Sequence, residues 1–350
     1  MPNTSPVRPG EEIDADRLKT YLEPRLGPWP DDPLTITEFI QGRSNLTYLL
    51  EVGDWCGVLR RPPLGPVAPR AHDMIREFQW LKAIHPVFPW APRPIWLCTD
   101  EAIIGSVFLI MEYKPGIVFA EDFTHPFTYA PELGSHVSQL MVKRLVDLHN
   151  VTWQHIPIQG WVKPEGFLAR QVTGWITRYH KAKVRTIPGD EELTGWLASH
   201  VPVSPPPTVI HYDYKLNNVV FYPDWSDLAG IFDWEMSTVG DPTADLAVAM
   251  SYWLEAGDPP LLHDALGASV TTRPGFWSRD EFVEAYSRES GRAVEHWPFY
   301  QTFAYFKLAV IIAQIYYRYA HGQTHDERFK SFDARTENLI HYALTIRPLG

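Results

Sequence analysis

From Leu34 to Leu59 the chain consists of short strand-like apolar runs separated by turn residues. Residues 34–40, 46–52 and 56–60 (LTITEFI, LTYLLEV and CGVLR) are rich in apolar and β-branched side chains. Turn signals at Gly42 and at Gly53-Asp54 separate them. This pattern predicts three short strands joined by tight turns, as in a small antiparallel sheet.

A helix and a further strand are predicted after these runs. The strand covers residues 107–111 and is followed by a turn or linker near residues 112–116, where Pro115 and Gly116 stand together. The helix covers residues 71–84, with apolar residues recurring at helical spacing. The residues expected on its apolar face are Ala71, Met74, Ile75, Phe78 and Leu81.

Beyond the linker the apolar pattern takes a helical period. Ser278 and Glu281 form a capping-box sequence, and Gly291 is a plausible helix stop. Residues 308–315 are apolar except for Gln314, and they are too short for the about 20 residues that a membrane span needs, so we expect a buried helix. Another apolar stripe predicts a helix through Val137, Leu140, Met141, Leu145 and Leu148.

These patterns predict an α+β protein in three parts. Residues 1–33 are interpreted as an N-terminal extension with a short helix near residues 15–22, and residues 34–113 as a small sheet-rich lobe. Residues 114–350 are expected to form a larger, mainly helical lobe, which contains one small strand pair near residues 208–221.

Composition limits the classes of function. The net charge of −11 argues against a general nucleic-acid-binding protein, which needs a basic face. The two cysteines, Cys56 and Cys98, provide neither a disulfide framework nor a zinc spacing, which suits a reducing cytosol. The polar, proline-rich N-terminus has no apolar core of a signal peptide. We therefore expect a cytoplasmic protein with no membrane or nucleic-acid partner and leave its oligomeric state open.

The stretch HYDYKLNNVVF, residues 211–221, places several polar residues between two strand-like runs. Asp213 precedes Asn218 by five residues, and Asp233 follows after a predicted hairpin whose turn begins at Pro223-Asp224. Such a hairpin places Asn218 and Asp233 close to each other. Phosphoryl transfer uses a carboxylate to orient a hydroxyl and accept its proton, and carboxylate and amide oxygens to hold Mg²⁺. We therefore predict Asp213 as the base and Asn218 and Asp233 as metal ligands.

The first lobe contains candidates for a phosphate clamp. Arg60 ends a predicted strand, and Glu77 lies on the next helix, which is the ion-pair arrangement that kinases use to hold phosphates. An arginine guanidinium can donate two hydrogen bonds to one phosphate group. A turn between two strands is expected to offer backbone N–H groups to the phosphates. This predicted phosphate loop consists of Gly42, Arg43, Ser44 and Asn45.

Together these motifs resemble the aminoglycoside phosphotransferase family, the small-molecule branch of the protein-kinase-like fold. The matching segments are GRSNLTYLL, VLRRPP, AHDMIREF, HYDYKLNN and IFDWEMSTVGDPTADLA, and they resemble most closely the branch allied to the kinase-like module fused to acyl-CoA dehydrogenases. The resemblance implies a bilobal fold with ATP between the lobes and adenine against the backbone of Glu112–Lys114. It implies Mg²⁺, Lys215 near the transferring phosphate, and a hydroxyacyl compound as acceptor.

Other interpretations remain open for several residues. His211 is expected to be structural, Asp241 fits a helix N-cap before Pro242, and Asp245 is expected to tie loops together. Glu235 fits a metal or substrate ligand as well as an ion pair. The aromatic residues Trp175, Tyr252 and Trp253 are interpreted as core.

Two other functions compete with the kinase acting on a hydroxyacyl compound. One is a kinase for aminoglycosides or choline-like alcohols. The other is a pseudokinase that binds a nucleotide as a regulatory module, and the presence of Asp213, Asn218 and Asp233 argues against it.

Overall fold

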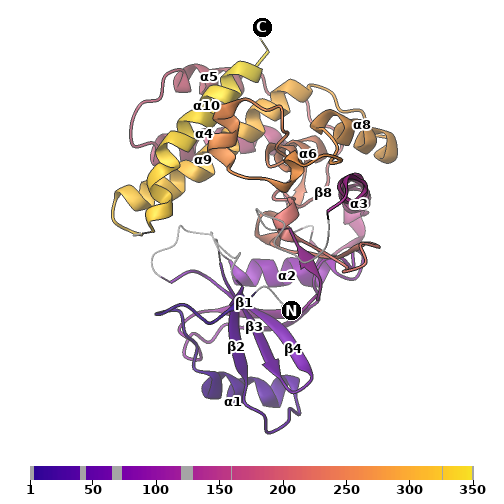
Figure 1. The fold of residues 1–350 in the computed structure, drawn as a ribbon, viewed down its shortest axis with the longest axis vertical. Coiled ribbons are helices and arrows are strands. Elements are labelled where there is room, and N and C mark those ends of the chain that lie inside the picture. Colours follow the sequence, from indigo (N-terminus) through magenta and orange to yellow (C-terminus); the bar gives the residue numbers. More distant parts are fainter. Residues whose placement is uncertain are drawn as a thin grey trace. The chain divides into compact units, whose positions relative to one another are not determined.

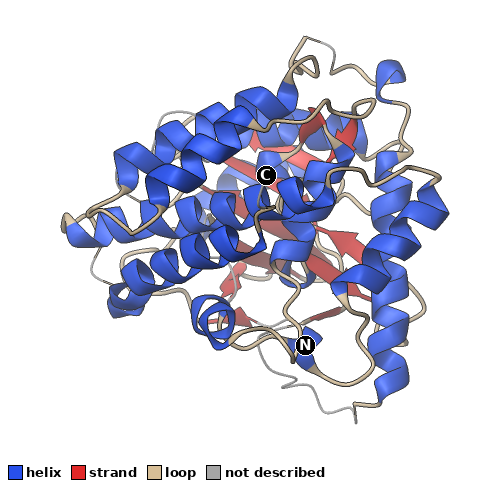
Figure 2. Ribbon diagram, turned by 90° about the horizontal axis from the view of Figure 1, so that it is seen from above, coloured by secondary structure: helices blue, strands red, loops and turns tan. Residues whose placement is uncertain are grey.

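The computed structural model describes residues 4–39, 45–64, 73–119, 129–158, 160–324 and 326–348. The chain divides into two compact units, both built from helices and strands (Figures 1 and 2). Unit 1 comprises Met1–Val118, Ile156–Ile158 and Leu216–Met236. Unit 2 comprises Phe119–His155, Gln159–Lys215 and Ser237–Gly350. Residues Leu216–Met236 therefore belong to the same unit as the six-stranded sheet. The division of the chain into three parts, made from the sequence, stays a prediction.

Unit 1 contains a six-stranded sheet in the order β1-β2-β3-β4-β6-β5, and all its neighbouring strands are antiparallel. The three strands predicted first and the strand predicted at residues 107–111 are all present. A tight turn at Gly53-Asp54 joins β3 directly to its antiparallel neighbour β4. The strands are β1 (Thr4–Ser5), β2 (Thr35–Phe39), β3 (Leu46–Val52), β4 (Trp55–Arg61), β5 (Pro94–Cys98) and β6 (Phe108–Glu112).

Helix α1 (Ala15–Leu26) packs on one face of this sheet (Figure 1). Leu18 and Leu22 of α1 join a buried cluster with alternate residues of β3, among them Tyr48 and Leu50. Side chains alternate between the faces of a strand, so these positions share one face. The segment predicted as an N-terminal extension, with a helix near residues 15–22, is therefore packed against the sheet.

Helix α2 (Met74–Ile84) begins after Asp73, whose carboxylate accepts a hydrogen bond from the N–H of Arg76. Its buried residues include Met74, Leu81 and Glu77, but Ile75 is 45% exposed. The predicted apolar face was wrong at Ile75. The buried face is rotated because Glu77 is drawn inward by an ion pair with β4, and hydrophobic spacing alone does not reveal such a pair.

A second sheet of unit 1 contains the predicted hairpin. Strands β9 (Val219–Phe221) and β10 (Leu228–Ile231) are antiparallel, and β7 (Ile117–Val118) pairs with the other edge of β9. A Cβ atom at Gly116 would lie 2.3 Å from the carbonyl oxygen of Phe221, so the predicted Pro-Gly turn needs its glycine for this close approach.

Unit 2 is mainly helical, as predicted. The stripe from Val137 to Leu148 is buried in α3, the capping box at Ser278 and Glu281 is formed, and α8 ends at Gly291 with φ 68°. Strand β8 (Thr208–Ile210) pairs with β11 (Thr238–Gly240). The helices are α3 (Pro131–His149), α4 (Phe167–Ala182), α5 (Asp190–Ser199), α6 (Pro242–Ser251), α7 (Pro260–Leu266), α8 (Arg279–Ser290), α9 (Trp297–Ala320) and α10 (Phe332–Ile346).

The apolar run at residues 308–315 lies inside α9, which packs along α10 and against α4 and α6. Its residues from Phe299 to Ala313 are mostly buried, which confirms the predicted buried helix. In the part of the chain that the structure describes, no helix has the length and apolarity needed to cross a membrane.

Candidate active site

Arg60 of β4 forms the centre of an ion-pair cluster inside unit 1. Its guanidinium contacts the carboxylate of Glu77 through Nη1 and lies 2.5 Å from Oδ1 of Asp233 through Nη2. The predicted ion pair between strand and helix is thus present. Adjacent strand residues point to opposite faces, so Arg61 instead donates to the Tyr48 hydroxyl and the Glu11 carbonyl on the α1 side.

Burial and charge act in opposite directions on this cluster. The side chains of Arg60 and Glu77 are 6% and 1% exposed. Burial acts to lower the pKa of Arg60, but the carboxylates of Asp233, Glu77 and Glu235 raise it above its ordinary value. Burial raises the pKa of Glu77 to about 7, although Arg60 acts to lower it. The cluster therefore has three carboxyl groups around one guanidinium and attracts a further cation or proton.

The raised pKa of Glu77 predicts a specific dependence of stability on pH. Native Glu77 holds its proton up to about pH 7, whereas the unfolded carboxyl loses it near 4.5. Because the native state binds more protons in this window, the free energy of unfolding should fall as pH rises from 4.5 to 7 and level off above it. We expect Glu77→Gln to remove about 1–3 kcal/mol of this fall.

This expectation is checked by urea unfolding of wild type and Glu77→Gln at pH values from 4.5 to 8. The difference between the two proteins isolates Glu77 from the other titrating groups. Parallel curves for the two proteins would show that Glu77 titrates alike in the folded and unfolded chains.

Glu235 and Asn45 extend the cluster. Nδ2 of Asn45 donates to Oε2 of Glu235 at 2.9 Å, and the same oxygen lies 3.9 Å from Nη2 of Arg60. Arg76 of α2 donates to the backbone carbonyl of Glu235 at 2.7 Å. Glu235 therefore takes part in the ion-pair network, one of its two predicted alternatives. Asn45, from the predicted phosphate loop, is part of the same network, whereas Gly42, Arg43 and Ser44 lie outside the described residues.

Asn218 and Asp233 flank the hairpin from its two ends. The N–H of Phe232 donates to the carbonyl of Asn218 at 2.8 Å, so the residue before Asp233 is bonded directly to Asn218. Asp233 has a φ of 65°, a left-handed backbone that is uncommon outside glycine. The hairpin thus brings the two predicted metal ligands together in unit 1.

The donor set fits Mg²⁺ better than a transition metal. Among the residues that the structure describes, no group of three or more His, Cys, Asp or Glu side chains is arranged to hold a metal ion. Mg²⁺ needs only one or two protein oxygens when phosphates and water complete its octahedron. Asp233 and Asn218 can supply these, and the excess of carboxylates around Arg60 favours a hard cation.

Glu112 ends β6, and Lys114 follows two residues later. Nζ of Lys114 lies 2.5 Å from Oε1 of Glu112 and 3.2 Å from the carbonyl of Pro89. The two side chains therefore pair with each other, which is compatible with a nucleotide contact made by their backbone rather than by their charges. Their role at adenine stays a prediction.

The first part of the predicted catalytic loop, residues 211–215, lies in unit 2. Asp245 of α6 accepts the N–H groups of His211 and Tyr212 at 2.8 and 2.7 Å. Burial acts to raise the pKa of Asp245, but the hydrogen bond from His149 and the charges and backbone bonds around it keep that pKa below its ordinary value. This confirms that Asp245 ties loops together. Asp241 caps α6, also as expected.

Asp213 and Lys215 form a close pair in this loop. Nζ of Lys215 lies 2.9 Å from Oδ2 and 3.1 Å from Oδ1 of Asp213, and 4.6 Å from the centre of the Tyr252 ring. Nδ1 of His211 accepts the N–H of Asp213 at 3.3 Å, a contact within the loop, whereas the expected bond of His211 to the backbone near Asp233 stays a prediction. Asp213 and Lys215 belong to unit 2, whereas the two candidate metal ligands belong to unit 1.

The residue before Asp213 is strained. Tyr212 has a φ of 67°, which costs roughly 1–3 kcal/mol for a non-glycine residue. Lys307 of α9 is buried beneath it, and its Nζ donates to the carbonyl of Tyr212 at 3.2 Å. Burial lowers the pKa of Lys307 to about 8, although the carboxylates of Asp213 and Asp245 act to raise it. Lys307 was not predicted as a site residue. The sequence feature that could have revealed it is a single lysine within a long apolar helix.

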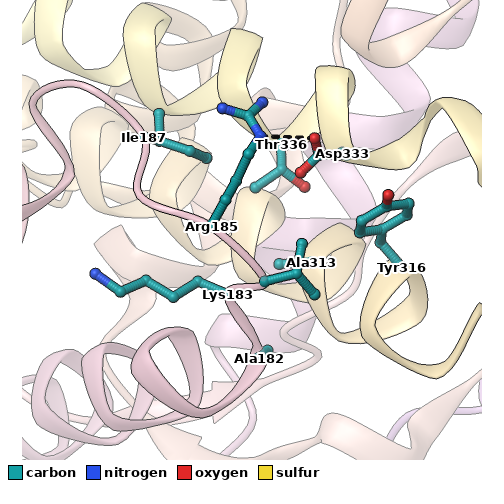
Figure 3. A pocket seen from close by; sticks show the side chains of 9 residues that line it. Ala182, Lys183, Arg185, Ile187, Ala313, Tyr316, Asp333 and Thr336 are labelled. Carbon is teal, nitrogen blue, oxygen red and sulfur yellow. Dashed lines mark hydrogen bonds and ion pairs between the residues drawn. The ribbon is translucent and has the colours of Figure 1, made fainter. Parts of the chain in front are cut away.

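A small pocket lies elsewhere in unit 2, between the end of α4, α9 and α10 (Figure 3). Its volume is about 10 Å³, and in it Nε of Arg185 lies 2.8 Å from Oδ2 of Asp333. Pockets for drug-sized ligands usually measure about 300–1,000 Å³. The pocket is smaller than that and includes none of the predicted site residues, so we do not assign it to the active site.

The fold and the charged sites define a kinase-like enzyme that transfers phosphoryl groups. The phosphotransferase enzyme family matches residues 35–297, and the chain belongs to this family. A putative aminoglycoside phosphotransferase from Ralstonia eutropha has a similar structure, with a TM-score of 0.75 and 25% identity over 95% of this chain and 99% of that chain. Choline kinase from Cryptosporidium parvum shares the fold at a TM-score of 0.61 and 13% identity, covering 96% of this chain and 98% of that one.

Two curated relatives are similar over nearly the whole chain. Acyl-CoA dehydrogenase family member 10 of Mus musculus is 33% identical over 345 residues, which cover 98% of this chain and 32% of that protein. Acyl-CoA dehydrogenase family member 11 of Homo sapiens is 32% identical over 328 residues, which cover 92% of this chain and 41% of that protein. The chain therefore spans less than half the length of these relatives. The predicted family, fold class and phosphotransferase class are confirmed.

Proposed function

We propose that this chain is an ATP- and Mg²⁺-dependent kinase that transfers the γ-phosphate to a hydroxyl group of a small hydroxyacyl compound. The observation that carries the proposal is the buried cluster in which Arg60 bridges Glu77 and Asp233. Protein kinases pair a strand cation with a helix glutamate and hold Mg²⁺ with a nearby carboxylate and amide, and Arg60, Glu77, Asp233 and Asn218 match these residue types.

In the proposed reaction Asp213 orients the acceptor hydroxyl and accepts its proton. The hydroxyl oxygen forms a bond to the γ-phosphorus, the bond from that phosphorus to the bridging oxygen breaks, and ADP leaves with the electron pair. Lys215, which holds the Asp213 carboxylate, offers positive charge to the transferring group. Asp233 and Asn218 are the residues that would hold Mg²⁺, which would supply positive charge to stabilise the phosphates.

The acceptor is proposed from charge and from the relatives. Lys215 places a cation beside the proposed base, because its Nζ lies 2.9 Å from Oδ2 of Asp213. Such surroundings suit an anionic acceptor better than a polycationic aminoglycoside, which needs carboxylates. The curated relatives are named as acyl-CoA dehydrogenases, which favours a hydroxyacyl compound, including one carried on coenzyme A.

One contact in the same cluster also supports the competing interpretation of the chain as a pseudokinase. Arg60 lies 2.5 Å from Asp233, so a metal ligand is already paired with a cation. A pseudokinase would keep this pair and bind adenine alone, whereas a kinase would exchange it for Mg²⁺ and phosphates. The affinities for ATP and adenosine separate the two, because only ATP offers phosphates to Arg60.

We expect Arg60→Ala to weaken ATP binding relative to adenosine by about 1.5–3 kcal/mol for each lost hydrogen bond to a phosphate. Arg60→Lys should recover part of this, since the charge returns without the two-pronged donor geometry. Glu77→Ala should act in the same direction, and its effect should add incompletely to that of Arg60→Ala because both residues share one interaction. Calorimetric titration with each ligand measures these differences.

Arg61→Lys is the matched control for the clamp. Arg61 is equally buried, but it contacts Tyr48 and Glu11 on the opposite face of the sheet. This variant should alter stability without altering the difference between ATP and adenosine. If ATP keeps its full advantage over adenosine in Arg60→Ala, Arg60 holds no phosphate and the kinase proposal loses its nucleotide clamp.

A further inference from the structure

Lys307 is the one charged residue in the buried part of α9. The helix WPFYQTFAYFKLAVIIAQIYYRYA contains only one other charged residue, Arg318, near its end. Lys307 is 1% exposed, and its Nζ lies 4.5 Å from the centre of the Tyr212 ring and 5.3 Å from that of Trp175. Burying an ammonium is costly unless it is paired, so its place in an apolar core calls for a compensating role.

One contact of Lys307 is with the backbone of the predicted catalytic loop. Its Nζ donates to the carbonyl oxygen of Tyr212, 3.2 Å away, and that carbonyl belongs to the peptide bond that leads into Asp213. Tyr212 is the strained residue with φ 67°, and its N–H is held from the other side by Asp245 at 2.7 Å. The two peptide groups that flank the strained residue are therefore fixed by side chains from two different helices, α6 and α9.

We propose that Lys307 is a positioning residue, which holds the peptide bond between Tyr212 and Asp213 so that the Asp213 carboxylate is oriented toward the acceptor hydroxyl. The proposal rests on the proposed function of Asp213 as the base. A left-handed tyrosine would relax toward ordinary backbone angles without such support, and relaxation would rotate the peptide that carries Asp213. A displacement of about 1 Å at a reacting group can cost on the order of 10²-fold in rate.

The test compares Lys307→Met, which keeps length and apolar volume, with Lys307→Arg, which keeps the charged donor. Thr302→Val on the same helix is the matched control, because Thr302 is also buried and its hydroxyl bonds only within α9, to the carbonyl of Pro298. Hydrogen exchange of the amides at residues 211–213 reports on the loop itself. Turnover of MgATP with a hydroxyacyl-CoA as acceptor and MgATP affinity report on the consequence.

In Lys307→Met we expect faster exchange at residues 211–213, a turnover lower by about 10²-fold, and unchanged MgATP affinity. Lys307→Arg should recover part of the turnover, and Thr302→Val should behave as wild type in the loop. Loop exchange in Lys307→Met equal to that in Thr302→Val would overturn the proposal, as would normal turnover despite a loosened loop. Absence of turnover in wild type would overturn the proposed function instead, and the exchange data would still decide whether Lys307 holds the loop.

Discussion

Asp213→Asn is expected to reduce phosphoryl transfer by about 10²-fold or more while leaving nucleotide affinity nearly unchanged. Asparagine keeps the size of the side chain and most of its hydrogen bonds, but it cannot accept the proton of the acceptor hydroxyl. The substitution also removes the ion pair to Lys215, whose Nζ lies 2.9 Å from Oδ2 of Asp213. The measurement is the rate of ADP formation at saturating MgATP and acceptor, together with MgATP affinity by calorimetry.

Asp224→Asn is a suitable control for this substitution. Asp224 lies in the turn between β9 and β10, where its carboxylate accepts the N–H of Ser226 at 3.0 Å. Its change to asparagine alters the same atoms and leaves the site untouched, so turnover should stay at the wild-type rate. Near-normal turnover in a folded Asp213→Asn protein would remove Asp213 from the role of base.

The second large effect is expected at Asp233. Asp233→Ala should abolish the dependence of ATP binding on Mg²⁺, because it removes the charged ligand of the proposed metal site. Asn218→Ala should weaken that dependence less, since an amide oxygen carries no formal charge. Asp233 also pairs with Arg60 at 2.5 Å, so its removal frees the guanidinium. Binding of metal-free ATP should therefore be kept or strengthened in Asp233→Ala.

Calorimetric titration of ATP with and without Mg²⁺ in wild type and both variants tests this expectation. The metal-free titration is an internal control, because a variant that has merely lost its fold would bind ATP under neither condition. Equal MgATP affinity in wild type and Asp233→Ala would exclude Asp233 as a metal ligand.

The fold was largely predictable, because its elements follow strong local patterns. Short apolar and β-branched runs marked β2, β3 and β4, helical spacing marked α3, and a continuous apolar run marked the buried part of α9. The packing of α1 on the sheet was not predictable, since only a few of its residues, such as Leu18 and Leu22, are buried and its pattern is mostly polar. The rotated face of α2 was missed because apolar spacing alone was used to place it, although the pair of Glu77 with Arg60 was predicted separately.

The candidate site was predictable where its residues lie at a recognisable spacing along the sequence. Asp213, Asn218 and Asp233 follow from one loop and one hairpin, and Arg60 with Glu77 from a strand and the next helix. Contacts between residues far apart in the chain were not predictable. Asn45 and Glu235 are 190 residues apart, and Lys307 bonds to a residue 95 positions earlier. Without knowledge of that bond, a single lysine in an apolar helix is expected to lie on the surface.

The most direct test of the proposed kinase activity is transfer of labelled γ-phosphate from MgATP to a panel of acceptors, followed by mass spectrometry of the acceptor. The panel should contain hydroxyacyl-CoAs, free hydroxy acids, aminoglycosides and amino alcohols. The kinase proposal predicts a labelled phosphate ester on a hydroxyacyl compound, with one ADP formed for each ester and no ester in Asp213→Asn. Recovery of intact MgATP with every acceptor, by a protein that binds MgATP, would contradict it and favour the pseudokinase.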